Sequence, residues 1–189
     1  MEWPAPHSAS KDGRSSERPH SPSKDGRSSE RPMSGAELLV DRPRLTARRL
    51  AGLGQTLISG DLDMGLPALA PGAPMLGLYA LAPEGAHGLR IGRTSALLVT
   101  PAPIAAIDGW CDGWCATSVD DGWAAVDVNG EDAGQALMQA TSADLALGSP
   151  SAAVLVFGLR ALLVKTPAGF RVHVESPWLE TLIAWLDGV

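Results

Sequence analysis

The chain has 189 residues, of which 45% are hydrophobic, so it can bury the core of one domain or of two small packed halves. Its formal net charge is -6, and residues 33–189 carry nine Lys or Arg against sixteen Asp or Glu. An acidic body repels phosphate backbones, so we do not expect nucleic-acid binding. The chain has no uninterrupted apolar run of about eighteen residues and no secretory signal pattern, so we expect a cytoplasmic protein without a membrane span.

The N-terminal segment is a tandem repeat. Residues 7–19, HSASKDGRSSERP, recur at 20–32 with Ala9 replaced by Pro22. These residues offer little apolar surface to offset the entropy of ordering, so we predict a disordered arm at 1–32 and a folded domain at 33–189. The repeat is either a flexible docking arm or a stretch without a selected role, and Met33 would serve as an alternative start.

The first half of the domain, about 36–118, reads as β-rich. Residues 36–53 predict a strand or short helix and a turn, and 55–61 predict a strand. Pro and Gly punctuate 65–74, which predicts a loop, and 75–81 predicts another strand. Residues 89–100 predict one or two strands. A short helix is expected to begin at Pro103 and to end near Gly109.

The second half, about 119–189, has clearer periodicity. Apolar residues alternate along 123–128, Asn129-Gly130 predicts a turn, and 131–140 predicts a helix. Three strands follow at 153–157, 159–165 and 170–175, and a last helix starts at Ser176-Pro177. The order β-α-β-β-β-α is close to a ferredoxin-like unit with one extra strand. We therefore predict an α+β protein with two ferredoxin-like halves.

Three segments resemble a known family in order and spacing. They are GLRIGRTSALLVTP at 88–101, DGWAAVDVNGEDAGQALMQATSADL at 121–145 and GFRVHVESPWLETLIAWL at 169–186. Over residues 36–189 the chain resembles the gamma subunit of heterotetrameric sarcosine oxidase. That family is related to the N-terminal folate-binding fold of the aminomethyltransferases, also called T-proteins.

The resemblance implies a non-catalytic subunit of an oxidoreductase complex that demethylates sarcosine or a similar N-methyl amine. Its partners would be larger flavoprotein subunits of alpha, beta and delta type. FAD, FMN, NAD and tetrahydrofolate would lie on those subunits, with none bound by this chain alone. The sequence agrees, because it contains no Gly-x-Gly-x-x-Gly turn for a dinucleotide.

Two carboxylates are candidates for holding the amine of a folate. Asp127 lies in a predicted strand and Asp144 lies in the resembled Asp-Leu pair. Alternatively, Asp127 lies on a solvated strand face and Asp144 caps a turn. A stand-alone tetrahydrofolate-binding aminomethyltransferase and a general interaction module therefore remain alternative functions.

Other polar residues give no catalytic or metal pattern. His173 alternates with Arg171 and Glu175, which predicts a solvated strand face rather than a general base. Cys111 and Cys115 are too few for a zinc site, so we expect no metal.

Tryptophan supplies most of the aromatic surface, and it is favoured at the centres of interfaces. Two groups occur, one within residues 110–123 and one on the last helix, where the two tryptophans are two turns apart. We predict a partner interface at Trp110, Trp114, Trp123, Trp178, Leu182 and Trp185.

Overall fold

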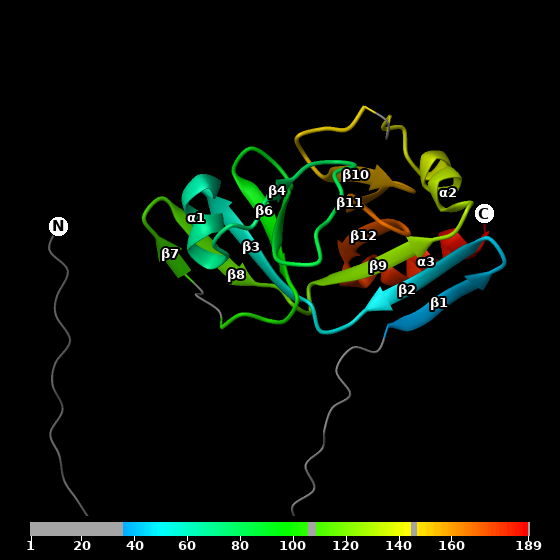
Figure 1. Cartoon of the computed structure of the whole chain (residues 1–189), viewed down its shortest axis with the longest axis horizontal. Helices are drawn as coiled ribbons and strands as arrows, with labels where there is room; N and C mark the ends of the chain where they lie inside the picture. The colour runs from blue at the N-terminus through cyan, green and yellow to red at the C-terminus, as the bar shows by residue number, and fades with distance from the viewer. Residues whose placement is uncertain (1–35, 106–108, 145–146, 189) are drawn as a thin grey trace, which may run out of the picture. The chain divides into compact units, whose positions relative to one another are not determined.

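The structure, a computed structural model, describes residues 36–105, 109–144 and 147–188. The arm predicted at 1–32 lies outside the described residues. The described residues form two six-stranded sheets, three α-helices and one 3-10 helix (Figure 1). The predicted α+β class is confirmed.

Sheet A joins strands from both ends of the described chain. In order across the sheet, its strands are β1 (Glu37–Arg42), β2 (Leu45–Leu50), β9 (Trp123–Asn129), β12 (Gly169–Glu175), β11 (Leu159–Thr166) and β10 (Ala153–Val156). All neighbours pair antiparallel. Side chains alternate along a strand, so Val126 and Val128 of β9 face one side of the sheet and Asp127 faces the other.

Sheet B is built from the middle of the chain. In order across the sheet, its strands are β4 (Met75–Leu76), β5 (His87–Arg90), β6 (Ser95–Thr100), β3 (Gly54–Gly60), β8 (Trp114–Ser118) and β7 (Gly109–Cys111). The β4–β5 pair is parallel and the others are antiparallel.

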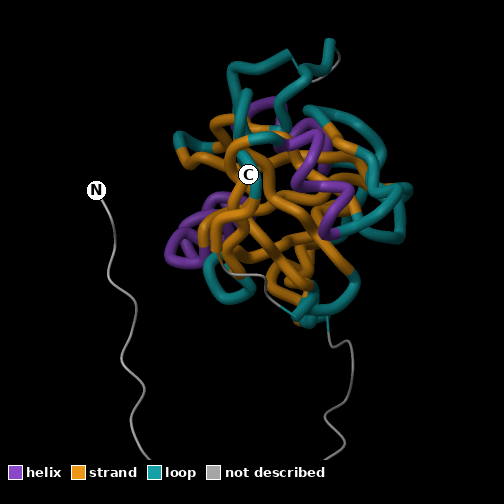
Figure 2. Tube along the Cα trace, turned by 90° about the vertical axis from the view of Figure 1, so that its left-hand side faces the viewer, coloured by secondary structure: helices purple, strands orange, loops and turns teal. Residues whose placement is uncertain are grey.

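The sheets and helices stack in four layers. Helix α1 (Leu62–Leu69) covers the outer face of sheet B. Helix α2 (Ala133–Ala140) and helix α3 (Leu179–Gly188), which follows the 3-10 helix η1 (Ser176–Trp178), cover the outer face of sheet A (Figures 1 and 2). The inner faces pack together through Leu89 and Leu97 of sheet B and Leu162 and Val164 of sheet A. Groups on the inner faces are therefore removed from water.

Helix α1 replaces the first half of the loop predicted at 65–74, so that prediction is wrong at residues 65–69. Pro67, one of the residues that favour a loop there, lies inside the helix. Packing outweighs it, because Leu62 and Leu66 are buried against sheet B. Gly65 allows close contact with Trp114, since a Cβ on Gly65 would lie 3.1 Å from the indole Cδ2.

Asp61 begins helix α1, and its loss should weaken that layer. Its carboxylate accepts hydrogen bonds from the backbone N–H groups of Asp63 and Met64, at 3.0 and 3.1 Å. We expect Asp61→Ala to lower the free energy of unfolding by about 1 kcal/mol. Asp61→Ser keeps a side-chain oxygen that can cap the helix, so its free energy of unfolding should fall by only a small part of that amount. Urea denaturation of both variants measures the difference, and equal losses would contradict a capping role.

The predicted halves, 36–118 and 119–189, do not coincide with the two sheets. Strands β1 and β2 pair with β9, so residues 37–50 belong to the sheet of the second half. The described residues place one helix on sheet B, so the first half lacks the second helix of a ferredoxin-like unit. In the second half, β9, α2, β10, β11, β12 and α3 appear in the predicted order.

The helix predicted from Pro103 is also wrong. Residues 103–105 have no regular structure, and Gly109–Cys111 forms strand β7. Gly109 and Gly113 have φ angles of 144° and 78°, which suit the ends of a tight hairpin and not a helix.

Candidate functional site

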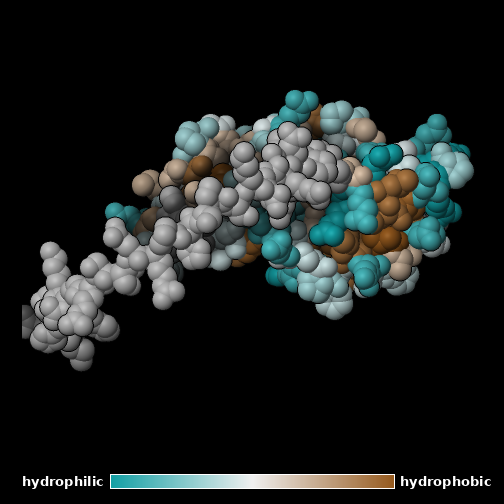
Figure 3. All heavy atoms as spheres, turned by 90° about the horizontal axis from the view of Figure 1, so that it is seen from below, coloured by the Kyte–Doolittle hydropathy of each residue, from teal (hydrophilic) through white to brown (hydrophobic). Residues whose placement is uncertain are grey.

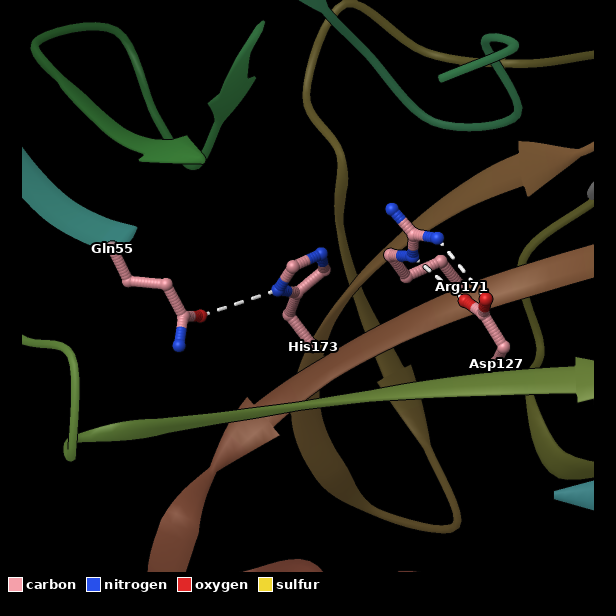
Figure 4. Close-up of polar contacts among 4 residues, drawn as sticks. All are labelled: Gln55, Asp127, Arg171 and His173. Atoms are coloured by element: carbon pink, nitrogen blue, oxygen red, sulfur yellow. Dashed lines mark hydrogen bonds and ion pairs between the residues drawn. The ribbon is translucent and has the colours of Figure 1, made fainter. Parts of the chain in front are cut away.

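A group of polar side chains lies between the two sheets. Arg171 and His173 on β12 and Asp127 on β9 point toward sheet B, because their neighbours Val126 and Val172 point toward the helices. Gln55 on β3 and His87 on β5 approach from sheet B. We call these five residues the inter-sheet cluster, and Figure 4 shows four of them.

Arg171 and Asp127 form a bidentate ion pair. The two residues are directly opposite each other in the β9–β12 ladder. The Arg171 Nε donates to Oδ1 of Asp127 at 2.7 Å, and its Nη2 donates to Oδ2 at 3.0 Å (Figure 4). Each side chain is 19% exposed. Both oxygens of this largely buried carboxylate accept hydrogen bonds from Arg171, so the carboxylate is occupied within the protein and is not presented to a ligand.

His173 is fully buried beside this pair. Its Nδ1 lies 3.3 Å from Oε1 of Gln55 (Figure 4). The Gln55 amide is oriented by its Nε2, which donates to the carbonyl oxygen of Trp123 at 2.8 Å. The amide oxygen can only accept, so the Nδ1 of His173 carries the proton and its Nε2 is an acceptor. The solvated position predicted for His173 is wrong, because sheet B covers this face.

His87 approaches the same region from β5. It is 2% exposed, and its Nδ1 lies 2.9 Å from the carbonyl oxygen of Gly85, which again assigns the proton to Nδ1. Among the described residues, neither His87 nor His173 has a hydrogen-bond partner for Nε2.

Both imidazoles are neutral at pH 7. Burial, with the Arg171 guanidinium and His87 as lesser causes, lowers the pKa of His173 from 6.5 to about 3. Burial also lowers the pKa of His87, opposed by its bond to Gly85 and assisted by Arg171. An imidazole with so low a pKa is rarely protonated near pH 7. The two histidines can therefore accept hydrogen bonds but are poorly suited to general base catalysis.

The folate candidates are not brought together. Asp127 lies on the face of sheet A that meets sheet B, whereas Ala143, next to Asp144, packs with the core under α2. Asp144 itself is exposed. Sequence reasoning missed the partners Arg171, Gln55 and His87. The alternation of β9 and β12 placed Asp127 and Arg171 on one face, but no sequence signal indicated which residues of sheet B oppose them.

A groove lies at one open end of the inter-sheet layer. It has a volume of about 650 Å³. Its apolar wall includes Leu57 and Trp123, and its polar wall includes the ion pair of Arg160 with Glu175. Arg160, Glu175 and Trp123 lie side by side across β11, β12 and β9.

Three of the predicted interface tryptophans are exposed. Trp110 on β7 is 80% exposed, Trp178 in η1 is 48% exposed and Trp185 on α3 is 52% exposed. Trp123 is half-buried in the groove.

Trp114 and Leu182 lie in the core of the chain, so their side chains are not accessible to the partner interface predicted for them. Trp114 is 5% exposed beneath α1, and Leu182 is 1% exposed. On α3 the buried stripe consists of Leu182 and Leu186. Trp185 on α3 and Trp178 in η1 lie outside this stripe.

We searched the described residues for a metal-binding group of side chains and for a membrane-spanning helix. Within 36–105, 109–144 and 147–188, no three His, Cys, Asp or Glu side chains group as a metal site requires. Cys111 and Cys115 are both free thiols. No helix in this part of the chain has the length and apolar character needed to cross a membrane.

No family model and no curated protein matches the chain. Among solved structures, its fold is similar to that of a chain in the heterotetrameric sarcosine oxidase from Corynebacterium sp. U-96, in complex with pyrrole 2-carboxylate. The two chains superpose with a TM-score of 0.62 at 19% identity, over 79% of this chain and 85% of the other. The resemblance to heterotetrameric sarcosine oxidase is thus confirmed at the level of the fold.

Proposed function

We propose that this chain is the gamma-type subunit of a sarcosine oxidase-like complex that oxidatively demethylates sarcosine or a similar N-methyl amine. The observation that carries the proposal is the extent of the fold similarity, 85% of a chain from such an assembly. A shared fold alone does not determine function, so the proposal also uses the surface and the buried groups.

The buried polar groups support a structural role for the chain itself. Asp127 and Arg171 bind each other, and Gln55 joins His173 to the backbone at Trp123. We infer that this chain binds no cofactor alone. FAD, FMN, NAD and tetrahydrofolate would be held by larger subunits of alpha, beta and delta type in a cytoplasmic complex. The chain would keep the folate-binding fold of the aminomethyltransferases without using it for folate.

Exposed aromatic side chains support assembly with other subunits. Trp110, Trp178 and Trp185 each leave about half or more of their surface in water. Large exposed aromatics are typical of the centres of protein interfaces.

Co-expression with the flavoprotein subunits of a heterotetrameric sarcosine oxidase tests the proposal. We expect the chain to co-elute with them at fixed stoichiometry in size-exclusion chromatography, and the complex to oxidise an N-methyl amine. Tetrahydrofolate titrated into the isolated chain should give no binding heat. A chain that elutes alone while the other subunits assemble and turn over normally would contradict the proposal.

A further inference from the structure

Two buried histidines enter the inter-sheet layer from opposite sheets. His173 on β12 is 0% exposed and His87 on β5 is 2% exposed. The Nδ1 proton of His173 is engaged by Oε1 of Gln55, and that of His87 is engaged by the carbonyl oxygen of Gly85. Each Nε2 is therefore an acceptor, and within the described part of the chain neither has a donor. A buried acceptor without a donor is destabilising, so two of them indicate a bound molecule that donates.

The two rings are near each other. Gln55, Val99 and His87 follow one another across one row of sheet B. Neighbouring strands are about 4.8 Å apart, so the backbone of His87 lies about 10 Å from that of Gln55. The ring of His173 contacts Gln55, and its second nitrogen is directed away from Gln55 (Figure 4). His87 also contributes to the lowered pKa of His173, as a close neighbour does. One small molecule can therefore reach both Nε2 atoms.

Burial limits the size of this molecule. Apolar residues reach the surface of the protein, as the patch on the right of Figure 3 shows, and a partner could contact them there. His87 and His173 do not reach the surface, so no side chain of a partner can supply the missing donor.

Charge limits its identity. The Arg171 guanidinium opposes a positive charge at both imidazoles, so a cation is disfavoured between them. The described residues also contain no group of three His, Cys, Asp or Glu side chains for a metal ion. An anion has no proton to donate to two acceptors. Water is small and neutral and carries two donor hydrogens, so it meets all of these requirements.

We propose that one internal water molecule lies between the two sheets and donates one hydrogen bond to Nε2 of His87 and the other to Nε2 of His173. An internal water typically makes about three hydrogen bonds. Nη1 of Arg171 takes no part in the bonds to Asp127, so we expect it to supply the third. The water adds a polar link between the sheets to the apolar contacts of the inner faces. This inference is independent of the proposed function.

NMR spectroscopy of the full chain with isotope-labelled histidine tests the proposal. We expect a cross-peak between water and the Hε1 proton of both buried imidazoles, because Hε1 adjoins Nε2. His87→Phe removes one acceptor and keeps a ring of similar shape. The cross-peak at His173 should be lost in this variant, since the water has lost one of its two acceptors. The matched control is Leu89→Met, which changes an apolar side chain on the same face of β5 and should leave both cross-peaks in place.

Each other outcome overturns part of the proposal. Absence of both cross-peaks in the wild type overturns the site, whether or not His87→Phe folds. A cross-peak at His173 that persists in His87→Phe indicates separate waters and overturns the shared one. Loss of the cross-peaks in Leu89→Met overturns the assignment of the water to His87. Stoichiometric copper or zinc in the purified chain, lost in His87→Phe, overturns the choice of water over a metal ion.

Discussion

Lowering the pH from 7 to 4 is expected to reduce the free energy of unfolding by about 3 kcal/mol through His173 alone. The pKa of His173 is lowered to about 3 in the fold and is 6.5 in the unfolded chain. Above pH 6.5 both states are neutral and the group has no effect. As the pH falls below 6.5, the unfolded state takes up a proton that the folded state refuses, so stability falls until about pH 3. His87 acts in the same direction.

Urea denaturation between pH 7 and pH 4 measures this effect, and His173→Gln isolates it. The amide cannot be protonated in this range, so the variant should lose less stability on acidification, whatever its stability at pH 7. Carboxylates titrate alike in both proteins and cancel in the difference. Identical pH slopes for wild type and variant would show that His173 is not buried between the sheets.

Asp127→Ala should cost about 2 to 4 kcal/mol of stability at pH 7, because it leaves the Arg171 guanidinium largely buried without its carboxylate. The damage should centre on the inter-sheet layer, where Arg171 adjoins His173. A double variant, Asp127→Leu with Arg171→Met, should recover much of the loss, since paired removal leaves no orphan charge.

The matched control is the ion pair of Arg160 with Glu175 in the same sheet. Its side chains are 63% and 36% exposed, so Glu175→Ala should cost less than about 1 kcal/mol. Thermal and urea unfolding of the four proteins measure both pairs. Equal costs for the two pairs, or a double variant no more stable than Asp127→Ala, would contradict this account of the inter-sheet cluster.

The second half of the domain could be predicted because local signals and packing agree there. Alternation along 123–128 and the Ser176-Pro177 start predicted β9 and the final helical segment, and both are present. Helix α1 could not be predicted from local signals, because Pro67 argues against a helix and the decisive contact joins Gly65 to Trp114 of β8, which is far away in the sequence.

The polar cluster was beyond sequence reasoning for a similar reason. His173 alternates with charged residues, as on a solvated strand. Its burial is caused by residues such as Leu97 and Gln55, which are far away in the sequence and belong to another sheet. A strand pattern shows which residues share a face, but not what covers that face.

The order of strands in sheet A has a consequence for how the chain folds. Strand β9 pairs on one side with β2 and on the other with β12, and Arg48 lies opposite Asp127, 79 positions later. All strands of sheet B lie between β2 and β9 in the sequence. The β2–β9 pair of sheet A can therefore form only when the two ends of this long intervening segment come together. Such non-local pairing is slow relative to the local hairpins of sheet B. Until the last strands leave the ribosome, β1 and β2 remain an unsupported hairpin, and sheet B has no partner for its inner face.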